Sequence, residues 1–364
     1  VYSRAFSAED VSELYNLEKV PSYQQLGETI VGGPSRSGHT ITMNANGLRV
    51  ASGALVGPVR VYEWSEDAWS QLGDDITGVG PYPTGTISMD DSGDIIAVGE
   101  RSNNRARIYQ WDGTGWQQRG QDLSGEETTG ACVSISGDGN RVAVSTPGFG
   151  NAGAVRIYDW NGTGWEQRGQ VIAPNTAERS GHSISLSKNG TRVAIGAPNP
   201  GGLALSGSGF GYARVYELNN DEWAQIGEDL GGAQSFSEAG SSVSLSGDGS
   251  ILAVGEHLLD RKPGRVRVFQ WRENSWQQIG ADITGENWGN GDNLGGPGAQ
   301  AVAVSKDGSK VLVGGRGHAR DFSGQGVARL YERSEDSWLL VGEWKGEHAR
   351  SYTGTSVALN RDGT

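Results

Sequence analysis

Short runs in which apolar and polar residues alternate recur along the chain, and each run is bounded by a turn rich in glycine, asparagine or aspartate. The stretch from Ser134 to Val144 holds two such runs on either side of Gly137-Asp138-Gly139. The stretch from Ala154 to Gly169 holds two more, separated by Asn161-Gly162-Thr163-Gly164. A period of two residues is typical of β-strands, and Asp-Gly or Asn-Gly between two runs indicates a tight hairpin. This part of the sequence therefore predicts four short antiparallel strands.

The four-strand pattern is repeated about seven times, and each copy carries a glycine that follows an aromatic-x-Gln-x sequence, with Leu340 in place of Gln in one copy. Gly27 and Gly73 are 46 residues apart, and Gly280 and Gly342 are 62 residues apart. A period of roughly 40–50 residues with four strands in each repeat is the signature of a β-propeller. The full set of repeat glycines is Gly27, Gly73, Gly120, Gly169, Gly227, Gly280 and Gly342.

We therefore predict an all-β fold in which residues 1–364 form one seven-bladed β-propeller of four-stranded antiparallel blades. Residues 354–364 supply an innermost strand and residues 1–30 supply the remaining strands of the last blade, so that N- and C-terminal strands share one blade and close the ring. Such closure removes the exposed sheet edges. The predicted units are approximately 38–76, 85–123, 130–172, 181–230, 240–283, 298–345, and the split unit of 354–364 plus 1–30.

Two residue types recur in register with the strands and could suggest ligand sites. Arginine holds one position of the third strand in six units, and ten of the 12 tryptophans flank the hairpin between the third and fourth strands. A ligand site seldom repeats in register with a core pattern, so we interpret both sets as packing and ion-pairing groups within the blades. Trp288 and Trp344 are the two tryptophans outside the pattern. The arginines are Arg60, Arg107, Arg156, Arg214, Arg267 and Arg329.

Composition and charge exclude several classes of function. The chain contains 59 Gly and only 2 Met, which suits many strands and turns rather than packed helices. Its net charge of −13 would repel nucleic acid, and it has no run of 18 apolar residues that could span a membrane. Cys132 is the only cysteine, so an internal disulfide or a cysteine-rich metal site is excluded. The first residue is Val, which suggests an internal portion of a longer, multidomain precursor.

The repeat resembles the FG-GAP-type repeat of integrin-α-like seven-bladed propellers. The best local copy consists of Ser180–Leu186, Val193–Pro198 and Gly211–Tyr216. The resemblance implies the propeller fold, and some members of that family bind Ca²⁺ through an Asp-rich loop between the first two strands. Here the corresponding turns are short and supply one carboxylate each, whereas Ca²⁺ takes six to eight oxygen ligands. We therefore expect no metal and no cofactor.

The long connections all leave one face of the predicted propeller, opposite the short hairpin turns. Long loops on a rigid scaffold are where binding surfaces are usually built. The richest loop contains one tryptophan, two carboxylates and three amides, which could stack a sugar or hold a cation. The alternative is a glycine-rich surface loop pinned by a half-buried Trp288. The candidate binding residues are Glu286, Asn287, Trp288, Asn290, Asp292 and Asn293. The long connections are Asn199–Phe210, His257–Gly264, Ile283–Gly298, Gly315–Gly326 and Gly346–Thr353.

Neither the histidines nor the acidic pairs form a recognisable catalytic motif. His39 and His182 share one repeat position, which favours a structural role, and the sequence contains no HExxH motif and no nucleophile elbow. We therefore assign no catalytic residue. Asn161 and Asn189 begin Asn-Gly-Thr sequons on the short-turn face and are possible glycosylation sites, although the hairpins already require Asn-Gly there.

These observations predict a non-enzymatic binding or scaffold propeller, extracellular or on a cell surface, that engages a protein or glycan partner through the long-loop face. The repeat count, the acidic, cysteine-poor composition and the one-sided loop lengths favour a module of a larger extracellular assembly. A lectin-like carbohydrate-binding propeller is the first alternative. A hydrolase or lyase with its site at the mouth of the central tunnel is the second, and it requires a cluster of carboxylates or histidines there.

Overall fold

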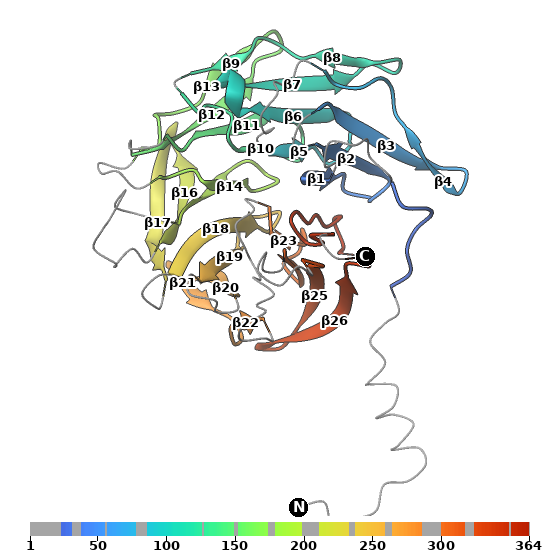
Figure 1. The fold of residues 1–364 in the computed structure, drawn as a ribbon. Coiled ribbons are helices and arrows are strands. Elements are labelled where there is room, and N and C mark those ends of the chain that lie inside the picture. The colour runs from blue at the N-terminus through green and yellow to red at the C-terminus, as the bar shows by residue number, and fades with distance from the viewer. Residues whose placement is uncertain are drawn as a thin grey trace, which may run out of the picture.

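In the computed structural model, the described residues form a ring of antiparallel sheets (Figure 1). Described are residues 23–30, 38–54, 57–77, 86–125, 127–148, 152–173, 179–198, 211–232, 237–258, 264–285, 300–316, 324–348 and 351–363. Within these residues each sheet contains a blade of four strands that pair in chain order, and two sheets carry a short fifth strand. The first strand of each blade lies nearest the centre of the ring and the fourth lies at the rim.

The first three blades have the following strands. Blade one contains β1 (Thr40–Met43), β2 (Arg49–Gly53), β3 (Val59–Ser65) and β4 (Ala68–Gln71). Blade two contains β5 (Ile87–Met89), β6 (Ile95–Glu100), β7 (Arg105–Trp111) and β8 (Trp116–Gln118), with a 3-10 turn (Arg101–Asn103) and a short β9 (Leu123–Ser124) that also pairs with β7. Blade three contains β10 (Val133–Ile135), β11 (Arg141–Thr146), β12 (Ala154–Trp160) and β13 (Trp165–Gln167).

The other three blades continue round the ring. Blade four contains β14 (Ser183–Leu186), β15 (Arg192–Ala197), β16 (Tyr212–Asn219) and β17 (Glu222–Gly231). Blade five contains β18 (Ser237–Leu245), β19 (Ile251–Leu258), β20 (Arg265–Arg272) and β21 (Ser275–Gln278), with a short β22 (Ile283–Thr284) that pairs with β20. Blade six contains β23 (Val302–Val304), β24 (Lys310–Gly315), β25 (Val327–Ser334) and β26 (Ser337–Lys345).

The described residues thus form six four-stranded blades, and the prediction of seven blades is wrong. The predicted innermost strand of the seventh blade, Ser356–Leu359, lies between β23 and β1 but makes only isolated hydrogen bonds. Ser356 Oγ accepts one from Ile41 N at 3.0 Å, and Val357 N donates one to Gln300 O at 2.9 Å. A strand pair requires a repeated ladder of backbone bonds, which this segment lacks among the described residues.

The predicted N-terminal part of that blade is described only in part. Val1–Ser3 and Glu13–Tyr15, which were expected to supply its second and third strands, lie outside the described residues. The segment from Tyr23 to Gly27 packs between blades six and one. The Tyr23 ring meets Trp344 edge to face at 5.6 Å, and the Leu26 carbonyl accepts a hydrogen bond from Trp69 Nε1 at 2.9 Å. The off-pattern Trp344 is therefore explained by packing.

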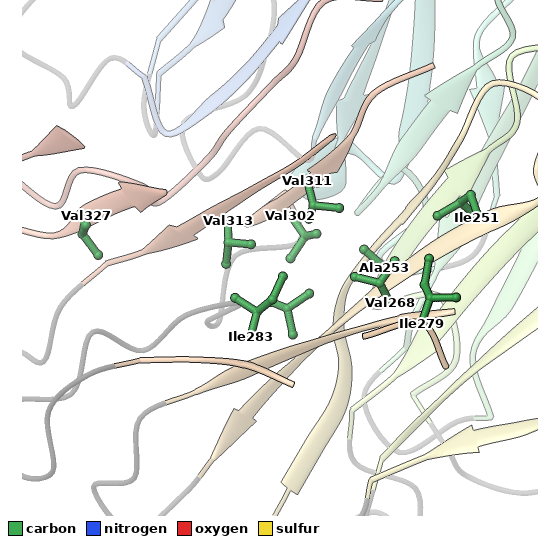
Figure 2. Packing of buried hydrophobic residues seen from close by; sticks show 10 residues of the cluster. Ile251, Ala253, Val268, Ile279, Ile283, Val302, Val311, Val313 and Val327 are labelled. Atoms are coloured by element: carbon green, nitrogen blue, oxygen red, sulfur yellow. The ribbon is translucent and has the colours of Figure 1, made fainter. Parts of the chain in front are cut away.

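The hydrophobic core lies between neighbouring sheets. Figure 2 shows the cluster between blades five and six, where Ile251 and Val268 of one sheet face Val302 and Val311 of the next. Four similar clusters fill the spaces between blades one and two, two and three, three and four, and four and five. Burying each such side chain contributes about 1.5–3 kcal/mol. The second strands are apolar almost throughout because both of their faces are covered.

Near the axis, the backbone of one blade is held by hydroxyl groups of the preceding blade. Leu186 N donates to Ser134 Oγ at 2.9 Å, and Leu245 N donates to Ser185 Oγ at 2.9 Å. Serine and threonine side chains are short, so these bonds bring adjacent inner strands close together. Equivalent bonds run from Ile87 to Thr40, Met89 to Thr42, Val133 to Thr86, Ile135 to Ser88, Val302 to Ser242 and Val304 to Ser244.

At the rim, an indole N–H of each blade donates to a backbone carbonyl just before the repeat glycine of the preceding unit. Trp165 Nε1 donates to Arg119 O at 2.8 Å, and a Cβ added at Gly120 would lie 2.7 Å from the Trp160 ring. Gln118 Nε2 donates to the Gly120 carbonyl, which completes the aromatic-x-Gln-x-Gly motif. The other indole bonds join Trp69 to Leu26, Trp116 to Leu72, Trp223 to Arg168, Trp276 to Ile226 and Trp338 to Ile279.

Replacing Trp165 by Phe removes this indole bond but keeps most of the aromatic packing. We expect a loss of about 1 kcal/mol in the free energy of unfolding, since the Arg119 carbonyl loses its donor. Trp160→Phe is the matched control, because the Trp160 ring packs on the same glycine while no hydrogen bond from its indole occurs among the described residues. Urea unfolding measures both variants, and equal losses would contradict the role of the N–H group.

Candidate functional site

The six candidate binding residues predicted from sequence, Glu286, Asn287, Trp288, Asn290, Asp292 and Asn293, lie outside the described residues. Both ends of their loop are described. Before the loop, Thr284 pairs with Arg265 and the buried Ile283 pairs with Val266 in the fifth blade. After it comes Gln300, which leads into the inner strand of the sixth blade. The loop therefore spans two neighbouring blades on the long-loop face, and its proposed chemistry stays a prediction.

Gln300 is fixed at the long-loop end of the central channel. Its Oε1 atom accepts hydrogen bonds from the hydroxyls of Thr40 and Ser356, and its Nε2 atom donates to Ile87 O at 2.8 Å. These partners come from blade one, the C-terminal segment and blade two. One side chain thus ties the end of the candidate loop to three other parts of the channel wall.

The channel itself is narrow and lined with hydroxyl groups. The inner strands and residues 357–359 enclose a cavity of about 160 Å³. The hydroxyl oxygens that line the channel also accept hydrogen bonds from backbone N–H groups of the next blade. They therefore both line the channel and hold neighbouring blades together. In two units, Ala303 and Ala358 take the equivalent position. The lining hydroxyls are those of Thr42, Ser88, Ser134, Ser185 and Ser244.

At the short-turn end, the hairpin turns are joined by a closed ring of backbone hydrogen bonds. The six blades supply six turns and residues Asn360–Gly363 supply a seventh, so the C-terminal segment completes this ring without forming a blade. All the bonds are between 2.8 and 3.2 Å long. In order they run from Ala45 N to Asp91 O, Asp91 N to Gly137 O, Gly137 N to Lys188 O, Asn189 N to Gly247 O, Gly247 N to Lys306 O, Lys306 N to Arg361 O and Arg361 N to Ala45 O.

Charged side chains cross the channel at this end. The Asp91 carboxylate of blade two lies 2.9 Å from Lys306 Nζ of blade six and 3.4 Å from Lys188 Nζ of blade four. Burial alone would raise the pKa of Asp91, but the hydrogen bond from Lys306 and the charge of Lys188 outweigh it, so the pKa lies below its usual value. A cavity of about 60 Å³ beside them is also lined by Arg361.

Sequence alone does not reveal this group, because each member lies in a different hairpin turn. The second position of the turn motif is charged in four copies and small in the other three. The charged residues are Asp91, Lys188, Lys306 and Arg361, and the small ones are Ala45, Gly137 and Gly247. The pairing of Asp91 with the two lysines indicates a bridge between alternate blades rather than a reactive centre.

The turn carboxylates act as hydrogen-bond acceptors for their own hairpins. Asp138 Oδ1 accepts from the Ser136 hydroxyl at 2.6 Å and from Asn140 N at 3.0 Å. Over the described part of the chain, no group of three or more His, Cys, Asp or Glu side chains could hold a metal ion. The described residues likewise include no helix long and apolar enough to cross a membrane.

The two possible glycosylation sites lie at exposed hairpin turns. Asn161 Oδ1 accepts hydrogen bonds from Thr163 N at 2.9 Å and Gly164 N at 2.9 Å, and Asn189 Oδ1 accepts one from Thr191 N at 3.1 Å. Both amides therefore cap their own turns, which accounts for Asn-Gly-Thr at these places. Glycosylation of Asn161 and Asn189 stays a prediction.

At least five of the six repeated arginines form ion pairs inside their own blades. Arg60 pairs with Asp75 at 2.8 Å, and Arg214 pairs with Asp229 at 2.7 Å. The hydrogen bond from Arg60 is the largest influence on Asp75 and lowers the pKa of that carboxyl. Arg107, Arg267 and Arg329 pair with Glu100, Glu256 and Glu343, respectively. These contacts support the structural interpretation of the repeated arginines.

Comparison with known proteins shows similarity in structure without similarity in sequence. No family model matches this chain, and no curated protein matches it. The hydrazine synthase of Kuenenia stuttgartiensis is 12% identical with a TM-score of 0.62, and the alignment covers 94% of each chain. A protein from Lactobacillus plantarum is 14% identical with a TM-score of 0.56, covering 84% of each chain.

The β-propeller domain of Myceliophteria thermophila Cps50 (Swd1) is 14% identical with a TM-score of 0.59, and the alignment covers 89% of this chain and 90% of that domain. Identities of this size show the fold alone, because one fold carries many unrelated functions. The protein is a β-propeller, a fold compatible with a binding or scaffold role.

Proposed function

We propose that this protein is a non-enzymatic binding and scaffold module that engages a protein or glycan partner through its long-loop face. The observation that carries the proposal is the difference between the two ends of the ring. The short-turn end is closed by backbone hydrogen bonds and by the bridge from Asp91 to Lys188 and Lys306. These backbone and charged groups are used within the ring, which favours the opposite end as the surface for a partner.

The fifth blade supports this choice of surface. Its first two strands continue beyond the core toward the long-loop end, where Ser237 pairs with Leu258 and Glu238 pairs with His257. The inner strands of blades two and three have only three residues each. An extended hairpin beside the anchored ends of the 286–299 loop provides a rigid wall for a binding surface, and rigid supports lower the entropy cost of binding.

The proposed location is extracellular or on a cell surface, within a larger assembly. The resemblance of Ser180–Leu186, Val193–Pro198 and Gly211–Tyr216 to FG-GAP-type repeats supports this proposal. The net charge of −13 also supports it, since it favours solubility and disfavours nucleic acid. A glycan partner is the form of the proposal that Trp288 favours, since an indole ring can stack on the apolar face of a sugar.

Exchanging residues 286–298 for a Gly-Ser segment of equal length tests the surface. The exchange keeps Ile283–Thr284, which pair with β20, and Gln300, which is bonded to the channel wall. We expect binding on a glycan array or on an array of extracellular protein domains to disappear, while the melting temperature changes by less than about 2 °C because no described core residue is altered. Wild-type binding that survives the exchange would contradict the assignment.

A single substitution within the same loop separates the two kinds of partner. If a sugar stacks on Trp288, we expect Trp288→Ala to weaken binding on the glycan array at least tenfold. If the partner is a protein only, we expect the variant to lose affinity on the protein array and to show no change on the glycan array. Trp344→Ala is the control, because Trp344 packs against Tyr23 at the rim and belongs to a different surface. A glycan signal that both variants retain would remove the sugar-binding form of the proposal.

Asp91→Asn tests the structural role of the opposite end. We expect unfolding free energy to fall by about 1–2 kcal/mol at pH 7, since two lysines lose a charged partner, with no change in partner binding. The folded pKa of Asp91 is lowered, so its contribution is present above the unfolded pKa and is lost as pH falls through the folded value.

The stability difference between Asp91→Asn and wild type should therefore shrink in acid below about pH 4, near the ordinary aspartate pKa. Urea unfolding between pH 3 and pH 7 measures this difference in unfolding free energy. Glu222→Gln is the control for the loss of one negative charge, because Glu222 is exposed. A difference that stays constant over this range would show that the carboxylate charge is not responsible.

A further inference from the structure

The seven hairpin turns at the short-turn end of the ring enclose a small cavity at the mouth of the channel. Its volume is about 60 Å³, and all seven turns lie within the described residues. Three cationic side chains line it, those of Lys188, Lys306 and Arg361, together with the carboxylate of Asp91. The cavity therefore has an excess of two positive charges, in a chain whose net charge is −13.

Two glycines let the charged side chains lie over neighbouring turns instead of extending into solvent. A Cβ added at Gly137 would lie 2.9 Å from Asp91 Oδ2, and one added at Gly247 would lie 2.4 Å from Lys306 Cγ. Real Cβ atoms do not approach other heavy atoms this closely. Asp91 and Lys306 thus occupy space over the channel mouth that a larger residue in the adjacent turn would take from them.

The charged groups of the cavity are partly shielded from water. The side chains of Asp91, Lys188 and Lys306 are between 26% and 35% exposed. Apolar side chains form another part of the lining and also line the channel behind the cavity. Charges interact more strongly where the surroundings are less polar than water, so an anion in this place would be held more firmly than on an open surface. The apolar residues are Met43, Leu245, Val304 and Leu359.

The cations of the cavity have hydrogen-bond donors to spare. An ammonium group has three N–H donors and a guanidinium group has five. Lys306 Nζ donates to Asp91 Oδ2 at 2.9 Å. Lys188 Nζ donates to the Met89 carbonyl at 3.3 Å and lies 3.4 Å from Asp91 Oδ1. The Arg361 side chain makes no hydrogen bond or ion pair with any described residue, so its charge has no counterpart there.

We propose that this cavity binds hydrogen phosphate. Its two negative charges match the excess of positive charge, and its oxygens accept hydrogen bonds from the ammonium groups of Lys188 and Lys306 and from the Arg361 guanidinium. At about 10–15 Å³ for each water-sized group, the cavity holds roughly four to six such groups. Hydrogen phosphate, a phosphorus atom with four oxygens, is of this size.

The Asp91 carboxylate makes this site selective for an oxyanion that carries a proton. An ionised carboxylate can only accept hydrogen bonds, and it has about four lone-pair positions, of which the two lysines use a part. Hydrogen phosphate has one O–H group that can donate to Asp91, whereas sulfate has none at neutral pH. A sulfate oxygen beside Asp91 meets a like charge without a hydrogen bond. We therefore expect phosphate to bind more tightly than sulfate.

Isothermal titration of the whole protein with sodium phosphate, sodium sulfate and sodium chloride tests the proposal, at pH 8 and constant ionic strength. We expect phosphate to saturate one site, sulfate to bind at least fivefold more weakly, and chloride not to saturate. Absence of saturation up to about 20 mM phosphate, or equal binding of phosphate and chloride, would overturn the site. Sulfate that binds as tightly as phosphate would overturn the assignment of hydrogen phosphate as the ligand.

Substitutions at the cavity should act in opposite directions. Arg361→Gln and Lys306→Gln each remove a cation and should weaken phosphate at least tenfold. Asp91→Asn removes the negative charge that faces the anion, so sulfate should bind at least fivefold more tightly than it does to the wild type. A general disturbance of the channel mouth would weaken every anion in every variant, and that result would overturn the proposal. Circular dichroism checks that each variant is folded, and Arg361→Gln breaks no side-chain contact with a described residue.

Arg272→Gln is the matched control for the loss of one positive charge. Arg272 is exposed and ends β20 at the hairpin that leads to β21, at the same end of the ring but away from the channel. This variant should bind phosphate as the wild type does. Equal losses in Arg272→Gln and Arg361→Gln, or full binding in both Arg361→Gln and Lys306→Gln, would contradict the site. The proposed role of the long-loop face is measured with different probes and does not depend on this result.

Discussion

The hydrogen bond from a backbone N–H of one inner strand to a serine or threonine hydroxyl of the preceding blade is the contact on which this ring depends. A buried backbone donor must find an acceptor, and the next blade is too far for a sheet ladder yet close enough for a two-atom side chain. At the rim, an indole bridges the wider gap and donates to the preceding unit. Small groups inside and large groups outside make each blade a wedge, and wedges of this shape close into a ring.

Much of this architecture could be predicted from sequence because it is local. The Asp-Gly and Asn-Gly turns, the repeat glycines and the paired tryptophans report directly on hairpins and packing. The prediction of seven blades was wrong for a physical reason. The sequence contains seven copies of the repeat glycine, and the C-terminal turn Asn360–Gly363 does join the hydrogen-bonded ring. A blade also requires four strands in register, and Ser356–Leu359 makes only isolated bonds in the part of the chain that the structure describes.

The sites were harder to predict than the fold. Asp91 and Lys306 are 215 residues apart, and the sequence of neither turn indicates that the two side chains meet across the channel. The two residues meet because each occupies the same position of its own hairpin turn, and units of unequal length hide that equivalence in the linear sequence.

The closed ring of backbone bonds also bears on how this protein comes apart. An open array of repeats frays from its two ends, where a terminal unit has one neighbour instead of two. Here Arg361 is bonded to Ala45 and to Lys306, so the C-terminal segment acts as a clasp between the sixth blade and the first. With the clasp closed, every blade is an interior blade. Release of this segment would remove the backbone bonds at the junction and leave the Gln300 side chain and the Tyr23–Gly27 segment to hold the first and sixth blades together, so we expect opening of the ring to begin there.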